Sequence, residues 1–349
     1  MKTRFIAFAA AACLLLNFVA FANVDTRKQR AKKRQITRLV SLLPASDGVA
    51  VIDSKRFFND AMPQVLSANQ PILGEITTKL TEIENRTGIS LRKFDNVVVG
   101  VAMKEVKPKE VDFDTVAIAS GDINAGALIS IAKLASKGNY REEKINGRTV
   151  FVFTAKDVMQ KTSQTTKSKT TDMMNKALDG LTKEIAVSTL DNNTLVLGSF
   201  KRVTETLEAN TRVSSDLTTM LAQRAGSVMG FAIKTPNGTS KFLPLDNDEL
   251  GKNVDSIRYL SGSVDVAAVG TSLQLTAQTV KPEQAEGLKS TLEGLQILGG
   301  AVLGGSKRTD QRVYARMIKA AKFGVRANEV TLDLLVPQAD IDILIADVK

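Results

Sequence analysis

The chain has 349 residues, of which 43% are hydrophobic and 24% charged, and lysine plus arginine exceed aspartate plus glutamate by ten. It contains no histidine, no tryptophan and a single cysteine, Cys13. The lack of histidine excludes imidazole-based catalytic dyads and triads and imidazole metal sites.

The first 22 residues have the three parts of a cleavable signal peptide. A positively charged start, Met1–Arg4, precedes an apolar run that ends in the small-x-small sequence Ala20-Phe21-Ala22. We therefore expect export and a mature chain that begins at Asn23. Without Cys13 the mature chain also lacks a thiolate nucleophile or metal ligand, which leaves Ser–Lys, carboxylate-pair or hard-cation chemistry. No motif identifies such a site, and we expect no catalytic residues, no metal site and no cofactor.

Two alternatives to cleavage stay open. The apolar run over residues 5–22 is at the lower limit for spanning a hydrocarbon core of ~30 Å, so it could act as an uncleaved anchor. Positive charges that directly follow an apolar segment resist translocation, and this favours the anchor. Lipidation at Cys13 is a third reading, although the sequence stays apolar well past that residue.

The positive charge is concentrated in a basic arm, residues 23–38, which has seven basic residues and one acidic residue. Residues 39–349 are nearly neutral, with 38 basic and 36 acidic residues. A basic tail can contact an anionic membrane or an envelope polymer, or it can be a solvated leader without a partner. The candidate contacts with such an anionic surface are Arg27, Lys28, Arg30, Lys32, Lys33 and Arg34.

Nucleic acid is not an expected partner. The mature chain has 13 aromatic residues and no tryptophan, so platforms on which bases could stack are scarce.

The first half of the chain alternates between short strands and amphipathic helices. The clearest local signal is Asn146-Gly147, because these residues supply the two positive φ angles of a type I′ hairpin turn. A polar, low-complexity segment, residues 160–172, is expected to form a mobile loop. The predicted elements are a strand at 49–52, helices at 55–66 and 72–86, strands at 97–103 and 115–119, a helix at 125–137, hairpins at 140–153 and 184–198, and a helix at 201–209.

The second half repeats this order, without the extra hairpin and helix at 184–209. The predicted elements are a strand at 228–233, a helix at 248–255, strands at 257–267 and 272–279, helices at 283–298 and 310–321, a hairpin at 322–336 and a helix at 338–348. Hairpins with intervening helices are typical of an α+β fold with largely antiparallel sheets. We expect two related lobes, residues 39–212 and 213–349, from an internal duplication, with hairpins 140–153 and 322–336 as equivalents.

Several motifs are similar to known sites but lack essential residues. Ser90–Lys93 and Ser130–Lys133 match Ser-x-x-Lys without the downstream partners of penicillin-binding enzymes. The glycine-rich sequence 299–307 has Gly-Ser-Lys where a phosphate loop needs Gly-Lys-Ser. Residues 246–249 have oxygen ligands without the spacing of a calcium loop, and a helix N-cap explains them.

Three sequence stretches, Leu42–Asp53, Asn192–Gly198 and Pro337–Asp340, resemble secreted bacterial proteins of unknown function that have two similar α+β lobes. The resemblance implies an exported protein with a non-enzymatic or uncharacterised role, and it brings no catalytic residues.

The predicted function is that of a non-catalytic protein, periplasmic or secreted, that acts by binding or scaffolding, with a cleft between lobes as its site. One alternative is an enzyme that uses Ser–Lys or carboxylate chemistry, and another is a membrane-tethered protein with an uncleaved anchor. The sequence does not identify the ligand.

Overall fold

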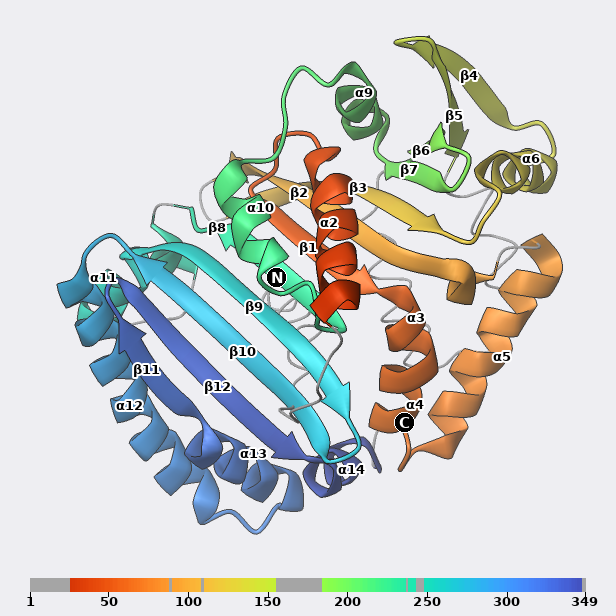
Figure 1. The fold of residues 1–349 in the computed structure, drawn as a ribbon. Helices are drawn as coiled ribbons and strands as arrows, with labels where there is room; N and C mark the ends of the chain where they lie inside the picture. Colours follow the sequence, from red (N-terminus) through yellow and green to blue (C-terminus); the bar gives the residue numbers. More distant parts are fainter. Residues whose placement is uncertain are drawn as a thin grey trace. The chain divides into compact units, whose positions relative to one another are not determined.

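The computed structural model describes residues 26–87, 90–107, 110–154, 184–236, 238–242 and 248–346, and these form an α+β fold (Figure 1). The expected signal peptide and the polar segment 160–172 lie outside the described residues. The chain divides into an N-terminal unit, Arg30–Asn59 with Pro71–Ala222, and a C-terminal unit, Asp60–Gln70 with Gln223–Val348, to which the described residues 26–29 are also assigned. The expected boundary between the lobes was at residue 212. The observed boundary follows Ala222, so helix α10, residues Ser215–Ala222, lies in the N-terminal unit and not in the C-terminal one.

Seven strands of the N-terminal unit pair in the order β1-β2-β3-β7-β6-β5-β4, and each pair is antiparallel. The strands are β1 Gly48–Asp53, β2 Phe94–Lys107, β3 Glu110–Gly121, β4 Tyr140–Ile145, β5 Arg148–Thr154, β6 Glu184–Asp191 and β7 Thr194–Gly198.

The helices of this unit follow the predicted periodicity, except at the start of the chain. They are α2 Thr26–Ser41, α3 Ser54–Arg56, α5 Gln70–Thr87, η2 Leu91–Lys93, α6 Ala125–Ala135, α9 Phe200–Glu208 and α10. The helix expected at 55–66 is divided into α3, a π-helical turn η1 over Phe57–Ala61, and α4 over Met62–Val65. Pro63 lies in the first turn of α4, where a missing N–H costs no hydrogen bond.

The β4–β5 hairpin confirms the turn predicted from Asn146-Gly147. The two residues have φ angles of 47° and 74°, and Ile145 pairs with Arg148 across the turn. The Asn146 side-chain amide also donates to the Leu207 carbonyl of α9 at 3.0 Å. Val150 and Val152 are buried on one face of β5, and Phe153 is buried on the other.

α6 packs against the β6–β7 side of the sheet. Its buried residues Ala125 and Ile129 contact Leu195 of β7, with Phe151 and Val187 packed around them. The helix begins at Asn124, whose side chain accepts from the Ala127 backbone N–H at 2.9 Å.

Five strands of the C-terminal unit pair in the order β8-β9-β10-β12-β11, again all antiparallel. The strands are β8 Met229–Lys234, β9 Ile257–Ala267, β10 Gly270–Thr279, β11 Lys322–Arg326 and β12 Glu329–Pro337. The helices are α4, η3 Thr239–Phe242, α11 Asp248–Asp255, α12 Pro282–Gly304, α13 Thr309–Ala320 and α14 Gln338–Ala346.

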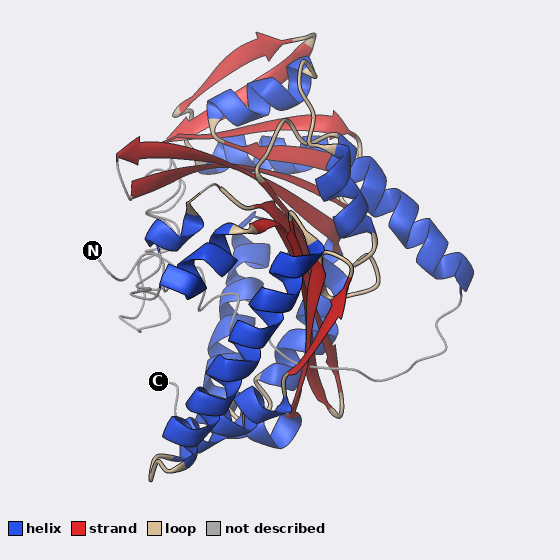
Figure 2. Ribbon diagram, turned by 90° about the vertical axis from the view of Figure 1, so that its left-hand side faces the viewer, coloured by secondary structure: helices blue, strands red, loops and turns tan. Residues whose placement is uncertain are grey.

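α12 and α13 run side by side along one face of these strands (Figures 1 and 2). Ala285 and Leu288 of α12 form a buried cluster with Val330 of β12. Val330, Leu334 and Val336 are buried on the inward face of β12, whereas Leu332 on that face is half-buried.

Five strands of the N-terminal unit pair in the same order as the five strands of the C-terminal unit, but the hairpins that correspond are not the expected ones. β10 pairs with β12, and the strand that occupies the same place beside β3 is β7, not β5. The expected equivalence of hairpins 140–153 and 322–336 is therefore wrong: by strand pairing β6–β7 has the place of β11–β12, and β4–β5 lies beyond it at the end of the strand order. The sequence pattern could not decide this, because both hairpins have similar alternation and only strand pairing distinguishes them.

Candidate functional site

The basic arm forms most of helix α2, so it differs from the expected tail attached to a separate body. Ile36, Leu39, Val40 and Leu43 recur at helical spacing and are each at most 2% exposed. Burying this face anchors the helix. Lys32 also points inward, where it forms an ion pair with Asp53 at the end of β1.

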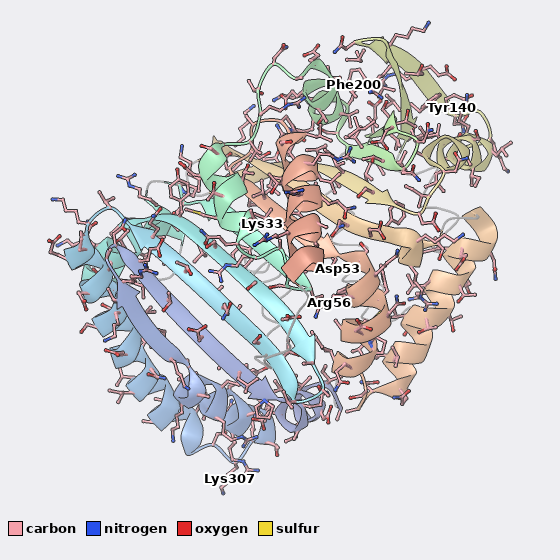
Figure 3. All side chains as sticks on the ribbon, viewed as in Figure 1. Lys33, Asp53, Arg56, Tyr140, Phe200 and Lys307 are labelled. Atoms are coloured by element: carbon pink, nitrogen blue, oxygen red, sulfur yellow. The ribbon has the colours of Figure 1, made fainter. Side chains whose placement is uncertain are left out.

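The six candidate contact residues are therefore not equivalent. Arg30, Lys33 and Arg34 are exposed on the outward face of α2, and Figure 3 labels Lys33 there. Lys32 is committed to Asp53. Arg27 and Lys28 lie in the first turn of the helix.

A row of polar side chains crosses the sheet on the face that carries the Lys32–Asp53 pair. Asp53 is the register partner of Asn96, Asn96 that of Ser120, and Ser120 that of Thr194, so the four lie on one face. Their exposed fractions are 9%, 3%, 5% and 1%. Burying polar side chains is costly unless they are hydrogen-bonded, yet Asn96 Oδ1 and Ser120 Oγ have no partner among the described residues.

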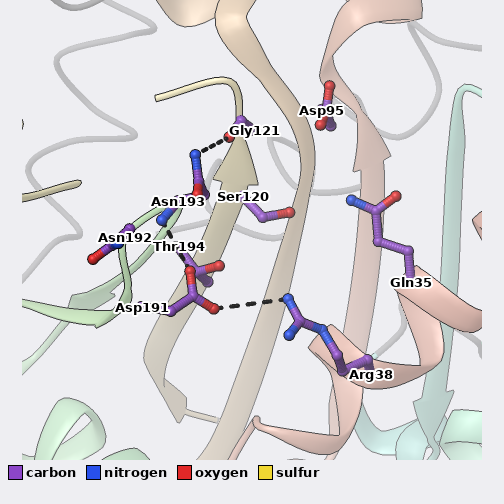
Figure 4. A pocket seen from close by; sticks show the side chains of 9 residues that line it. All are labelled: Gln35, Arg38, Asp95, Ser120, Gly121, Asp191, Asn192, Asn193 and Thr194. Carbon is purple, nitrogen blue, oxygen red and sulfur yellow. Dashed lines mark hydrogen bonds and ion pairs between the residues drawn. The ribbon is translucent and has the colours of Figure 1, made fainter. Parts of the chain in front are cut away.

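A pocket of about 560 Å³ lies over one end of this row (Figure 4). Gln35 and Arg38 of α2 form one wall, and the opposite wall is the β6–β7 turn with the end of β3. The described lining residues are Gln35, Arg38, Asp95, Ser120, Gly121, Asp191, Asn192, Asn193 and Thr194.

The turn that forms this wall is held by side-chain hydrogen bonds. Asp191 Oδ1 accepts from the Asn193 backbone N–H at 2.9 Å. The Asn193 amide donates to the carbonyls of Ile123 at 2.9 Å and Gly121 at 3.4 Å. Gly121 itself must be a glycine, because a Cβ there would lie 2.2 Å from the Lys93 carbonyl oxygen.

The charges in the pocket are mixed. Arg38 Nη2 lies 3.8 Å from Asp191 Oδ2, and these side chains are 62% and 47% exposed. Asp95 binds Lys55 at 2.6 Å, and this hydrogen bond raises the pKa of Lys55. Arg38 and Asp191 are thus neighbours of opposite charge, farther apart than a hydrogen bond, with polar atoms still open to the pocket.

The comparisons with known proteins add a likeness in fold. No known protein-family model matches the sequence, and no curated protein matches it. Crystal forms I, III and IV of TP0453, a protein of unknown function from the bacterium Treponema, are similar at 10–11% identity with TM-scores of 0.42–0.43. The alignments cover 88% of this chain and 96–97% of TP0453, and a likeness at this level concerns the fold alone.

The Ser-x-x-Lys sequence at 130–133 does not form a nucleophile–base pair. The Ser130 hydroxyl donates to the Gly126 carbonyl within α6 at 3.1 Å. Lys133 binds Glu142 at 2.9 Å and lies over the Tyr140 ring. The hydrogen bond to Glu142 raises the pKa of Lys133, which is the opposite of what a general base requires. In the second match Ser90 precedes η2, which contains Lys93.

The remaining motifs have structural explanations where they are described. The glycine-rich sequence 299–307 contributes the last residues of α12, which continues to Gly304 and so is longer than the expected helix 283–298, and part of the connection to α13. The sequence 246–249 lies partly outside the described residues. Within the described part of the chain, no group of His, Cys, Asp and Glu side chains has the arrangement of a metal site, and no helix is long and apolar enough to cross a membrane.

Sequence reasoning did not find the pocket residues. Arg38 belonged to the basic arm but was not among the contact candidates, and Ser120, Asp191 and Asn193 were read as strand ends and turn residues. A signal was present in Ile36, Leu39, Val40 and Leu43, whose spacing predicts a helix over the arm. Nothing in the local sequence indicates that Arg38 and Asp191 meet.

Proposed function

We propose that this protein is an exported, non-catalytic binding protein of the cell envelope, and that the outward face of α2 engages an anionic polymer. The observation that supports it is the rigid basic face formed by Arg30, Lys33 and Arg34. These residues are one helical turn or less apart, so their Cβ atoms are about 5–6 Å from their neighbours. A short row of cations at fixed spacing suits a partner with repeated negative charges.

The buried side of α2 favours a polymer over a lipid bilayer. A helix that lies in a membrane interface inserts its apolar face among the acyl chains. Ile36, Leu39 and Val40, which form the apolar face of α2, are already buried in the protein. The helix therefore offers only charge to the outside.

Polyanion binding and its salt dependence test this proposal. We expect the mature protein to bind inorganic polyphosphate with an affinity that falls as salt rises, because exposed charges are screened within about 8–10 Å at physiological ionic strength. The triple variant Arg30→Gln/Lys33→Gln/Arg34→Gln should bind at least 10-fold more weakly, measured by isothermal titration calorimetry. A matched triple variant at exposed positions elsewhere, Lys201→Gln/Lys307→Gln/Arg312→Gln, should retain the affinity.

Equal losses in the two triple variants would show that net charge, not α2, carries the binding. Tighter binding to anionic phospholipid vesicles than to polyphosphate would favour the membrane partner. Deleting residues 23–38 is not a suitable test, since it removes the buried Ile36 and the Lys32–Asp53 pair.

Export rests on the three-part leader. The expected mature N-terminus is Asn23, and N-terminal sequencing of native protein checks it. Residues 1–22 intact in a membrane fraction would instead support the anchor.

The two units are further proposed to be copies of one ancestral unit. The orders β1-β2-β3-β7-β6 and β8-β9-β10-β12-β11 support this, with a helix after the third strand and after the last strand in each unit.

A further inference from the structure

The pocket beside α2 carries an inference of its own, independent of the outward basic face. It contains a cation and an anion side by side, Arg38 and Asp191, and a buried hydroxyl, Ser120, that lacks a partner among the described residues. Leaving such a hydroxyl unpaired destabilises the folded protein. A ligand atom that bonds to it would remove that destabilisation.

The charge pair selects the class of ligand. A simple anion attracted by Arg38 would meet the Asp191 carboxylate 3.8 Å away, and a simple cation at Asp191 would meet Arg38. A molecule with adjacent opposite charges satisfies both groups at once. In an α-amino acid the carboxylate and the ammonium are attached to the same carbon, so they match this spacing.

The remaining lining groups agree with a polar amino acid. Gln35 and Asn192 add amide donors and acceptors around the charge pair. None of the nine described lining residues is aromatic, so the ring face on which a sugar would commonly stack is lacking there. The pocket volume of about 560 Å³ is within the usual range for small-molecule sites.

We propose that this pocket binds a free zwitterionic α-amino acid with a polar side chain. Arg38 holds the ligand carboxylate, Asp191 holds the ammonium, and the Ser120 hydroxyl bonds to the polar part of the ligand. Asp191 is suited to this because its other oxygen is fixed by the Asn193 backbone N–H.

The experiment is a calorimetric titration of the mature protein with L-glutamine and L-serine, after a thermal-shift screen of the twenty amino acids. Two analogues of the bound amino acid, one without the amino group and one with the carboxylate converted to an amide, should each bind at least 10-fold more weakly. Arg38→Gln, Asp191→Asn and Ser120→Ala should each weaken binding. Lys201→Gln, which removes an exposed cation on α9, should not change it.

Circular dichroism and melting temperature establish that the variants are folded. Equal binding of the analogue without the amino group would mean an anion site and would overturn the proposal. Preferential binding of neutral sugars, or no binding of any amino acid, would do the same. The triple variant Arg30→Gln/Lys33→Gln/Arg34→Gln keeps all nine described lining residues of the pocket and should retain amino-acid binding, and Ser120→Ala, which lies off α2, should retain polyphosphate binding, so failure of one proposal is distinguishable from failure of the other.

Discussion

The β3–β7 contact of the N-terminal unit and the β10–β12 contact of the C-terminal unit are built in the same way. Asn193 precedes β7, and its side-chain amide donates to the Gly121 carbonyl at the end of β3. Asn328 precedes β12, and its amide donates to the Thr279 carbonyl at the end of β10. In each unit the backbone returns the bond, from Gly121 N–H to Asn193 and from Thr279 N–H to Asn328.

The same register continues into both cores. Ala119 pairs with Leu195 two residues inside the first contact, and Ala277 pairs with Val330 two residues inside the second. Leu195 packs under α6 and Val330 under α12. The units thus share a strand register and a helix on the same face. They also share an asparagine clamp, by which we mean the asparagine before β7 or β12 whose side-chain amide donates to the carbonyl at the end of β3 or β10.

The units differ in what lies on the opposite face. In the N-terminal unit α2 supplies Lys32 to Asp53 and Arg38 to the pocket. In the C-terminal unit Arg224 lies against β10, where it donates to Gln274 and Thr276, and its burial lowers its pKa. The pocket and the C-terminal arginine thus lie on corresponding faces of similarly paired strands, and a variant of a pocket residue on α2 should affect the pocket without affecting the Arg224 contacts.

The largest expected effect comes from the core helices. Ile129→Ala in α6 and Leu288→Ala in α12 should each lower the free energy of unfolding by about 2–5 kcal/mol, since both side chains are buried. Hydrogen exchange should show the loss of protection concentrated in the strands under the altered helix. Leu298→Ala, at a position that is 63% exposed on α12, is the control and should change stability little. An unchanged melting temperature for either core variant would contradict the packing described here.

A smaller loss of stability is expected at Gly121, a position at which the two asparagine clamps differ. Gly121→Ala should cost about 1–3 kcal/mol, because its Cβ would lie 2.2 Å from the Lys93 carbonyl oxygen and 2.5 Å from Phe94 Cα, and backbone must move. The C-terminal unit has Thr279 at the matching position. Gly126→Ala, in the exposed first turn of α6 with no contact under 3.6 Å, is the matched control. Urea denaturation of both variants measures the difference, and equal stability would exclude a close approach at Gly121.

Most strands and helices were predictable from sequence because alternation and helical spacing are local properties. The predictions failed where the structure depends on contacts between residues far apart in the sequence. The seven basic residues of the arm concealed the apolar spacing of Ile36, Leu39 and Val40, whose burial requires the rest of the unit. The choice between two similar hairpins as the partner of β3 depends on pairing between residues about 75 positions apart, such as Ser120 and Thr194. The pocket depends on that pairing as well, so no local motif could reveal it.

The asparagine clamps should contribute about equally. Asn193→Ala removes the side-chain bonds to the Gly121 and Ile123 carbonyls, and Asn328→Ala removes the bond to the Thr279 carbonyl. Each variant should cost about 0.5–1.5 kcal/mol. Asn210→Ala, at an exposed asparagine after α9, is the control. A cost at Asn193 with none at Asn328 would mean that the clamp is not a shared structural feature.

The smallest effect concerns α13. Along the chain this helix follows α12 and precedes the β11–β12 hairpin, whereas in the N-terminal unit the β4–β5 hairpin stands between α6 and the β6–β7 hairpin. At the start of α13, Arg308 binds Asp310 at 2.6 Å, and this hydrogen bond lowers the pKa of the carboxyl group. The bond favours the ionised form, so its contribution is present above the ordinary pKa of aspartate and is lost as the pH falls through the lowered value. Both groups are exposed, and the effect on stability should therefore be slight.

Arg308→Ala should raise the Asp310 pKa toward its ordinary value. An NMR titration that follows the Asp310 carboxyl carbon measures this change. The rise should be incomplete, because the Gln311 backbone N–H also stabilises the carboxylate, as expected in the first turn of a helix. Arg312→Ala removes a guanidinium one turn further on, which contacts Thr309 instead, and should leave the Asp310 titration unchanged. Equal shifts in the two variants would mean that general positive charge, not the Arg308 hydrogen bond, holds the carboxylate, and that the start of α13 has no fixed ion pair.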